Sequence, residues 1–288
     1  MDRVQGVARE CGGVDVLIGG PPCQGFSNAN RNSWSSSNPN NRLVDTFFDY
    51  VVRLRPKVFV MENVQGILWT QSHNGGSLSV AAHVVRRSVA AGYRLYPKLL
   101  DSAWFGVPQN RSRFFLIGLH EDLGYGQDAF GKWGPFPRPT HGPAGRQPYV
   151  TLREAIADLP PIVNGHDCEE ISYHEPNGSR SEFLAFTRDG APKGKVWDHV
   201  VSTHADYVIE RYRRIPPGAN WSSIAHMMTN YADVDRTHSN IYRRLIWDQP
   251  SITVGHYRKA MLIHPEQHRG CGFRKFWPLD SGNSGRWI

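Results

Sequence analysis

Three short stretches of the sequence carry residue types that can do covalent chemistry together. Residues 15–27 read DVLIGGPPCQGFS, so Cys23 follows two glycines and two prolines. Glu62 stands in MENVQG, and Arg111 and Arg113 stand in VPQNRSR. A thiol near cations ionises more readily and becomes nucleophilic, a carboxyl group can hold or donate a proton, and arginine binds developing negative charge. Each residue alone has an ordinary structural alternative: a packed cysteine, a helix cap or a solvated pair of cations.

Each of these stretches borders an apolar run that is typical of a β-strand. Residues 14–18 end in the glycines and prolines, residues 57–60 end in MENVQG, and residues 114–118 follow VPQNRSR. Parallel α/β sheets place their active sites at the carboxyl ends of the strands. We therefore expect Cys23, Glu62 and the two arginines to share one cleft at one edge of a sheet.

Helical patterns alternate with these strands. Apolar residues recur at helical spacing in residues 43–54, residues 77–91 also read as a helix, and residues 93–99 read as a further strand. Alternation of this kind predicts an α/β fold with a parallel, doubly wound sheet.

The rest of the chain is less regular. Residues 28–41 form an Asn/Ser tract that predicts a long surface loop, and residues 131–148, rich in proline and glycine, mark a domain edge. Residues 151–159 predict a short helix. Residues 165–235 show little periodicity and are rich in His, Asn, Ser, Tyr and Arg. This composition is typical of a smaller, irregular domain that recognises a surface.

Composition narrows the class of protein. The 288 residues are 40% hydrophobic, which is enough for a real core, and their formal net charge of +7 suits a polyanionic partner. The 4 cysteines and 13 histidines are scattered, so we expect reduced thiols and no metal site. Apolar stretches are too short to cross a bilayer, which predicts a cytoplasmic protein without a membrane partner.

The motifs PPCQGFS, MENVQG and VPQNRSRFFLIG together resemble the catalytic motifs of DNA (cytosine-5) methyltransferases, in the same order. TLREAIADLP, NIYRRLIWDQPSITV and IHPEQHR are similar to later parts of that family. The resemblance implies the Rossmann-like parallel sheet of S-adenosylmethionine-dependent methyltransferases, with an inserted small target-recognition domain. It divides the chain into a partial catalytic domain at 1–150, a target-recognition domain with its connecting segment at 151–240, and a return to the catalytic domain at 241–288.

The resemblance also implies a role for each catalytic residue. Cys23 would add as a thiolate to C6 of a cytosine, Glu62 would hold or donate a proton at N3, and Arg113 would bind O2. Arg111 would support Glu62 or contact a phosphate. The activated C5 would then take the methyl group of S-adenosylmethionine.

Double-stranded DNA is the substrate that the resemblance implies. The target cytosine must leave the duplex to reach such a site. Gln24, Ser27 and Asn63 are the expected DNA contacts near the flipped base, and the loop at 28–41 is placed to close over the DNA. Base edges would be read from residues 165–235.

Cofactor contacts are fewer than the family pattern contains. Pro21 and Pro22 lie where the cofactor is expected, Asp2 stands about where the family has an acidic residue for the adenine, and Asn283 lies in a GNS that resembles the last cofactor motif. The glycine-rich motif that opens the family does not precede these residues. The sheet is therefore expected to be N-terminally incomplete, with an unpaired edge at DVLIGGPP.

Four accounts remain open from the sequence. The chain is one subunit of a split enzyme with a complementing N-terminal methyltransferase subunit, a truncated form, or a catalytically inactive DNA-binding remnant. A fourth account is cytosine-5 methylation of tRNA, because one branch of the family uses the same catalytic residues on RNA.

Overall fold

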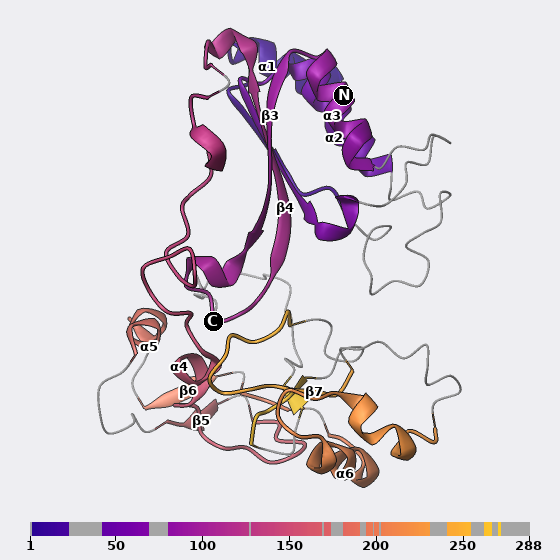
Figure 1. The fold of residues 1–288 in the computed structure, drawn as a ribbon, viewed down its shortest axis with the longest axis vertical. Coiled ribbons are helices and arrows are strands. Elements are labelled where there is room, and N and C mark those ends of the chain that lie inside the picture. The colour runs from indigo at the N-terminus through magenta and orange to yellow at the C-terminus, as the bar shows by residue number, and fades with distance from the viewer. Residues whose placement is uncertain are drawn as a thin grey trace. The chain divides into compact units, whose positions relative to one another are not determined.

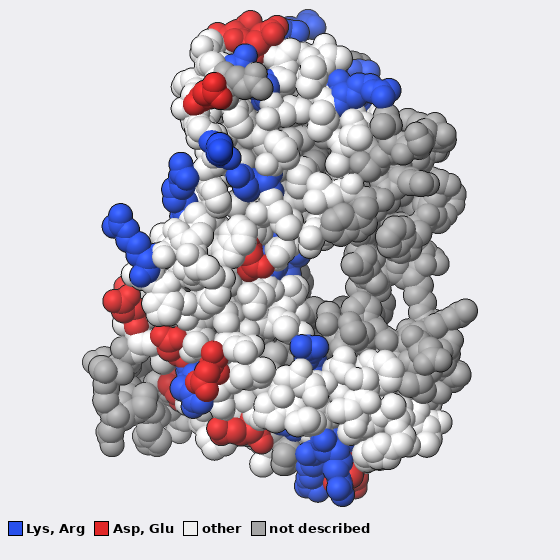
Figure 2. Space-filling model, viewed as in Figure 1, with Lys and Arg blue, Asp and Glu red and all other residues white. Residues whose placement is uncertain are grey.

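The computed structural model describes residues 2–22, 42–68, 80–126, 128–168, 170–173, 181–190, 194–197, 199–201, 203–230, 241–254, 262–266 and 270–271. Its contacts divide the chain into two compact units, Met1–Asp101 with Ser112–Pro139, and Ser102–Arg111 with Thr140–Ile288. Domain boundaries at 150 and 240 stay a prediction. No helix in the described part of the chain is long and apolar enough to cross a membrane. Charged side chains of both signs lie on the surface (Figure 2).

A four-stranded sheet organises the first unit (Figure 1). Its strands are β1 (Val16–Gly19), β2 (Val58–Val64), β3 (Tyr93–Asp101) and β4 (Ser112–His120), in the spatial order β1-β2-β4-β3. β1 and β2 are parallel, whereas β4 runs antiparallel to both β2 and β3. The α/β class is confirmed, but the sheet is mixed instead of fully parallel. Only residues 102–111 connect β3 to β4, and parallel neighbours need a longer crossover.

The direction of β4 decides where its first residues lie. An antiparallel strand begins at the edge where its parallel neighbours end, so β4 begins beside the carboxyl end of β2. In a fully parallel sheet, the residues that precede this strand would lie at the opposite edge. The shared edge that the sequence predicts therefore depends on a strand direction that the sequence did not predict.

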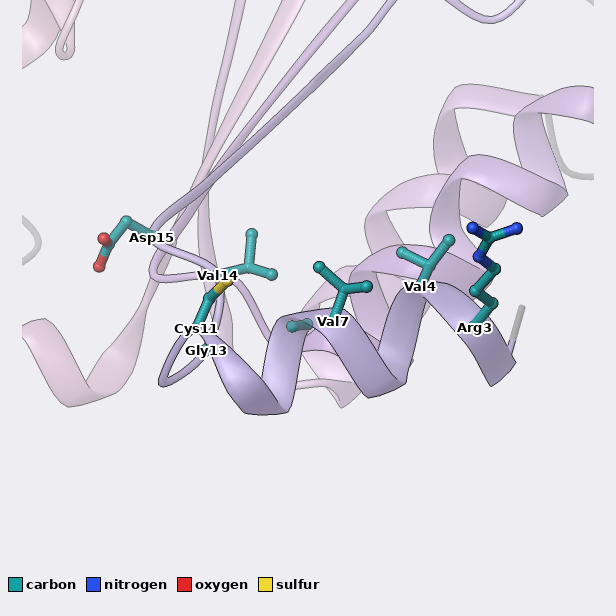
Figure 3. A pocket seen from close by; sticks show the side chains of 8 residues that line it. Arg3, Val4, Val7, Cys11, Gly13, Val14 and Asp15 are labelled. Carbon is teal, nitrogen blue, oxygen red and sulfur yellow. The ribbon is translucent and has the colours of Figure 1, made fainter.

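Helix α1 (Asp2–Glu10) precedes β1 and lies against α2 (Arg42–Leu54). An open hollow of about 560 Å³ lies beside α1 and the turn that leads into β1. Figure 3 shows Val4, Val7 and Val14 pointing to the same side of this hollow. Val4 and Val7 are exposed, so the hollow presents an apolar surface to solvent.

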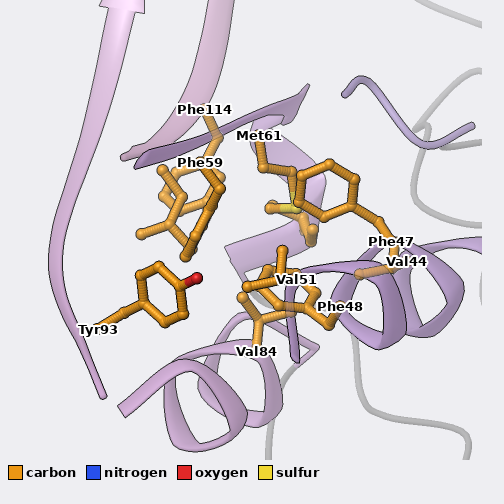
Figure 4. Close-up of a cluster of buried hydrophobic side chains, with 11 residues drawn as sticks. Val44, Phe47, Phe48, Val51, Phe59, Met61, Val84, Tyr93 and Phe114 are labelled. Carbon is orange, nitrogen blue, oxygen red and sulfur yellow. The ribbon is translucent and has the colours of Figure 1, made fainter. Parts of the chain in front are cut away.

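The main hydrophobic core of this unit lies between the sheet and helices α2 and α3 (Val80–Ala90) (Figure 4). Spacing of three and four residues puts one face of α2 against the sheet. The buried side chains of the cluster are Val44, Phe47, Phe48, Val51, Phe59, Met61, Ile67, Val84, Tyr93, Phe114 and Leu116. Aromatic rings meet edge to face within it, as between Phe48 and Phe59 at 5.6 Å. Each predicted strand and helix of this unit is present, although β1 begins at Val16 instead of residue 14 and β2 continues to Val64.

Short helical turns complete the first unit. They are η2 (Gln65–Leu68), η4 (Glu121–Leu123) and η5 (Gly131–Trp133). Gly118 of β4 lies against the ring of Phe59, which fills the space that a side chain would need. Burial raises the pKa of Tyr93 to about 12, and its hydroxyl donates to the carbonyl oxygen of Pro56 over 2.7 Å.

The second unit is built from short elements, as its composition predicts. Its helices are η3 (Ser102–Phe105), α4 (Leu152–Ile156), α5 (Glu182–Arg188), α6 (Asp206–Arg214) and η6 (Trp221–Met227). Its strands are β5 (Glu170–Ser172), β6 (Lys195–Trp197), β7 (Arg243–Arg244), β8 (Leu262–Ile263) and β9 (Gly270–Cys271). They form one two-stranded and one three-stranded sheet. Thr151 and Glu154 form a capping box at the start of α4, which confirms the predicted helix in this region.

Buried polar side chains hold these short elements together. Asp158 is 1% exposed and forms an ion pair of 3.0 Å with Arg188, and the hydroxyl of Tyr173 donates to the same carboxylate over 2.7 Å. Arg244 is also buried and donates to the carbonyl oxygens of Ile215 and His264. A unit with little regular structure depends on such bonds to fix its loops.

Candidate active site

Glu62 and Arg113 form an ion pair at the edge of the sheet in the first unit. The Nε of Arg113 lies 3.0 Å from Oε1 of Glu62. In the β2–β4 register Glu62 pairs with Phe115 and Val64 pairs with Arg113, so the two charged residues are diagonal neighbours on one face. The sequence prediction that these side chains come together is consistent with this geometry.

Both members of the pair keep polar groups available. The Glu62 side chain is 40% exposed and the Arg113 side chain 20%. Arg113 also donates from Nη1 to the carbonyl oxygen of Ser112 over 2.8 Å, which fixes the plane of the guanidinium. Within the described part of the chain, Oε2 of Glu62 and Nη2 of Arg113 have no hydrogen-bond partner. The pair therefore offers one carboxylate oxygen and one N–H group to a ligand.

Asn63 connects this pair to the turn after β1. Its side chain is 1% exposed, its Nδ2 donates to the carbonyl oxygen of Pro21 over 3.2 Å, and its Oδ1 accepts from the backbone N–H of Val64 over 2.9 Å. A buried amide with both groups bonded holds the turn in place. The predicted contact between Asn63 and DNA stays a prediction.

Two glycines allow the turn after β1 to pass close to its neighbours. A Cβ on Gly19 would lie 2.5 Å from the Phe47 ring, and a Cβ on Gly20 would lie 3.3 Å from Oε2 of Glu62. Gly19 therefore lets β1 pack on α2, and Gly20 leaves space beside the carboxylate. Pro21 and Pro22 follow in the same turn and restrict its backbone.

Other predicted site residues divide into two groups. Cys23, Gln24, Ser27, Asn283 and the loop at 28–41 lie outside the described residues. Asp2 is the first residue of α1, and its side chain is not described. Arg111 is exposed and belongs to the second unit, where its carbonyl oxygen accepts from the N–H of Ser102 over 3.2 Å. Its predicted support of Glu62 stays a prediction.

The sequence reasoning missed two parts of this arrangement. It assigned no role to Gly20, although the doubled glycine before the prolines is a signal of close backbone approach. It also did not predict the bond from Asn63 to Pro21, which joins residues 42 positions apart. No local sequence pattern predicts a contact between residues so far apart in the chain.

Comparison with known proteins supports the same family. The family model described as C-5 cytosine-specific DNA methylase matches residues 5–246. The type II methyltransferase M.DdeI of Desulfomicrobium norvegicum is 31% identical over 273 residues, which cover 91% of this chain and 61% of that protein. The type II methyltransferase M1.HphI of Haemophilus parahaemolyticus is 33% identical over 272 residues, covering 93% and 59%. The chain thus spans about three fifths of the length of these relatives.

A solved structure supports the fold. It is that of a prophage-encoded protein of E. coli assigned as a DNA modification methyltransferase, with a TM-score of 0.60 and 20% identity. The match covers 93% of this chain and 69% of that one. At this identity the likeness concerns the fold alone.

Proposed function

Because the chain belongs to the C-5 cytosine-specific DNA methylase family, we propose that it carries the catalytic residues for methyl transfer to C5 of cytosine in DNA. The observation that supports this proposal most strongly is the Glu62–Arg113 ion pair, in which Nε of Arg113 lies 3.0 Å from Oε1 of Glu62. This pair lies beside the turn after β1, and Cys23 directly follows that turn in the sequence. A nucleophile, an acid and a cation are the groups that this reaction needs.

The reaction begins with activation of a weakly nucleophilic ring carbon. The thiolate of Cys23 adds to C6 of a flipped cytosine, and the electron pair of the C5–C6 double bond shifts through C4 toward N3, which leaves an enamine whose C5 is nucleophilic. With S-adenosylmethionine bound, C5 would take its methyl group, and the electron pair of the methyl–sulfur bond would stay on the donor sulfur. A base then takes the C5 proton, the electron pair of that C–H bond re-forms the C5–C6 double bond, and the C6–S bond breaks with its electron pair left on the sulfur of Cys23.

Glu62 and Arg113 act on the atoms that gain charge in the first step. N3 and O2 lie side by side on the cytosine, so adjacent groups can bind both. Glu62, as the acid, holds a proton at N3 through Oε2, and Arg113 donates from Nη2 to O2. Within this ion pair, Oε2 and Nη2 are the atoms that have no hydrogen-bond partner among the described residues. Donors fixed in advance at sites of developing charge stabilise the transition state.

Members of this family use S-adenosylmethionine as methyl donor. The described residues fit a ligand at this edge, because Gly20 has no side chain and leaves space beside Glu62. A Cβ at this position would lie 3.3 Å from Oε2 of Glu62. Pro21 and Pro22 follow Gly20 in the turn and would hold the donor there, with Asp2 and Asn283 as further proposed contacts. When bound, S-adenosylmethionine supplies the methyl group for C5.

Duplex DNA is the proposed substrate, with the target base flipped out of the helix. Gln24 and Ser27 would contact the sugar-phosphate backbone, Arg111 a phosphate, and residues 165–235 the base edges. The relatives described above are type II methyltransferases, so a role beside a restriction enzyme belongs to the proposal. The expected cytoplasmic location stays part of it.

A complementing N-terminal methyltransferase segment is the proposed partner at β1. Among the described residues β1 pairs only with β2, and it lies at the end of the sheet order. Ile18 is 74% exposed on one face of this strand, while the apolar hollow beside α1 lies next to its first residues (Figure 3). An exposed strand edge with apolar side chains is a template for another strand. The occupant would be a strand with apolar residues on both faces, as in the interior of an α/β sheet.

Methyl transfer from labelled S-adenosylmethionine tests the function. The full chain is incubated with duplex DNA or with tRNA, alone and with a complementing N-terminal methyltransferase segment. We expect label in DNA and a large gain on complementation. Label in tRNA alone would favour the RNA alternative, and DNA binding without any transfer under complementation would favour a catalytically inactive DNA-binding chain.

A further inference from the structure

Residues 128–139 place aromatic and cationic side chains over strand β3. The Nζ of Lys98 lies 4.3 Å from the ring centroid of Trp133, and the guanidinium of Arg138 lies 5.6 Å from the same centroid. Lys132 precedes Trp133 and is exposed. Four residues, Lys98, Lys132, Trp133 and Arg138, therefore form one surface, called here the basic–aromatic surface. In Figure 2, Lys and Arg side chains follow the course of residues 128–139 in Figure 1.

This surface is held in a fixed conformation. The indole N–H of Trp133 donates to the carbonyl oxygen of Pro137 over 2.9 Å. Phe136 is buried, and Gly134, at φ 80°, allows the tight turn between the two aromatic residues. Cations that are already ordered lose less conformational entropy when a ligand binds them.

Charge on this surface is not neutralised by the described residues. Lys98, Lys132 and Arg138 have no ion pair within the described ranges. Some other cations of the same unit are paired, as Lys57 is with Asp15 at 2.6 Å and Arg87 with Asp49 at 2.6 Å. Lys98 and Arg138 over the indole ring, together with the exposed Lys132 next to Trp133 in sequence, are three uncompensated cations that fit a polyanion.

The basic–aromatic surface lies on the same face of the sheet as the candidate active site. Phe115 of β4 pairs with Glu62 on one side and with Lys98 on the other, so the three residues form one row across the sheet. Two strand spacings separate Glu62 from Lys98, or about 10 Å. A duplex that reaches Glu62 can therefore extend over this surface.

We infer that the basic–aromatic surface is a second DNA contact, which binds phosphates of the duplex away from the flipped base. This inference rests on the proposed function in one respect, which is that the ligand is DNA. Lys98, Lys132 and Arg138 contact phosphates without reading sequence, so the surface contributes affinity and orientation. Trp133 positions two of these cations.

Salt-dependent binding of the full chain to a labelled duplex tests the inference. Each phosphate contact contributes about 0.9 to the slope of log affinity against log salt concentration. The variant Lys98→Gln, Lys132→Gln, Arg138→Gln is expected to lower that slope by about 2 to 3 and to weaken binding by about tenfold or more at low salt. The double variant Lys132→Gln, Arg138→Gln keeps the stack of Lys98 on Trp133 and is expected to lower the slope by about 2.

A matched control uses cations on the opposite face of the sheet. Arg53→Gln with Arg86→Gln on α2 and α3 removes the same charge as the double variant, from two exposed positions. We expect the control to leave the slope nearly unchanged. Equal slopes for the double variant and the wild-type chain, or an equal loss in the control, would overturn the inference while the proposed function stands.

Two further outcomes separate this inference from the proposed function. A wild-type chain that binds no duplex at low salt overturns both. Binding of tRNA that weakens in the double variant, while duplex binding does not, overturns the assignment to DNA.

Discussion

The buried amide of Asn63 donates to the carbonyl oxygen of Pro21 over 3.2 Å, and this bond joins the strand of Glu62 to the turn that precedes Cys23. Asn63 is adjacent to Glu62 in β2, so one strand end carries the acid and also fixes the turn before the nucleophile. The relative position of these groups is therefore set by a contact that does not involve substrate.

Removal of that amide should slow methyl transfer as well as weaken the fold. Asn63→Ala leaves the Pro21 carbonyl without its donor, which we expect to cost about 1–3 kcal/mol of stability. A misplaced nucleophile should lower the single-turnover rate by about 10- to 100-fold. Ser88→Ala is the control, because it removes another buried hydrogen bond, Ser88 Oγ to the Val84 carbonyl at 2.9 Å, away from this edge. Equal rate losses in both variants would contradict the positioning role.

Close packing at Gly118 should make an added methyl group costly. Gly118→Ala would place a Cβ against the Phe59 ring, so we expect a loss of about 1–3 kcal/mol from overpacking. Gly126→Ala is the control, because its Cβ would meet nothing within 4 Å. Chemical denaturation measures both, and addition of Phe59→Leu should recover part of the loss in the first variant. Equal stability of the two alanine variants would show that the ring moves freely.

The buried ion pair of the second unit should be far more sensitive than an exposed one. Asp158→Ala leaves Arg188, which is 9% exposed, without its carboxylate, and such a change costs about 3–5 kcal/mol. Asp248 forms an exposed ion pair with Arg153, in which Nε of Arg153 lies at a similar distance, 2.8 Å, from Oδ1 of Asp248. Asp248→Ala should therefore change stability little. Thermal melting of both variants compares them, and a similar shift in the two melting temperatures would contradict the expected difference.

Acid should weaken the second unit through His204. Burial lowers the pKa of His204 from its ordinary 6.5, and its ring packs on Tyr212 with centroids 5.4 Å apart. Below pH 6.5 the unfolded chain takes up a proton that the folded imidazole resists, so stability falls as the pH falls. His204→Phe keeps a ring in place and should flatten this dependence in melting curves recorded on both sides of that pH. An unchanged pH dependence would assign the effect to other groups.

The spacing of apolar residues in the sequence predicted most of the helices and strands of the first unit. The apolar spacing in α2 and the apolar run of β2 depend on neighbours in the chain, and both elements lie within a few residues of their predicted positions. The direction of β4 depends instead on the short connection at 102–111. Local patterns do not report the direction of a strand.

Contacts between distant residues account for what the sequence did not predict at the site. Glu62 and Arg113 were expected to meet because residue types and strand ends suggested it. The bond from Asn63 to Pro21 and the stacking of Lys98 on Trp133 arise only when β2, β3 and their neighbours pack. The second unit is harder still to predict, since buried polar pairs such as Asp158–Arg188 replace regular structure there.

Covalent trapping on DNA that carries 5-fluorocytosine tests the central claim most directly. Fluorine at C5 cannot leave as a proton does, so methyl transfer leaves the enzyme bonded to C6. With S-adenosylmethionine and a complementing N-terminal methyltransferase segment, we expect the wild-type chain to form an adduct that resists denaturation. Adduct formation should be at least about 100-fold slower with Glu62→Gln, and Cys23→Ser should form no adduct. An adduct that persists in Cys23→Ser, or no adduct with the complemented wild-type chain, would contradict the account.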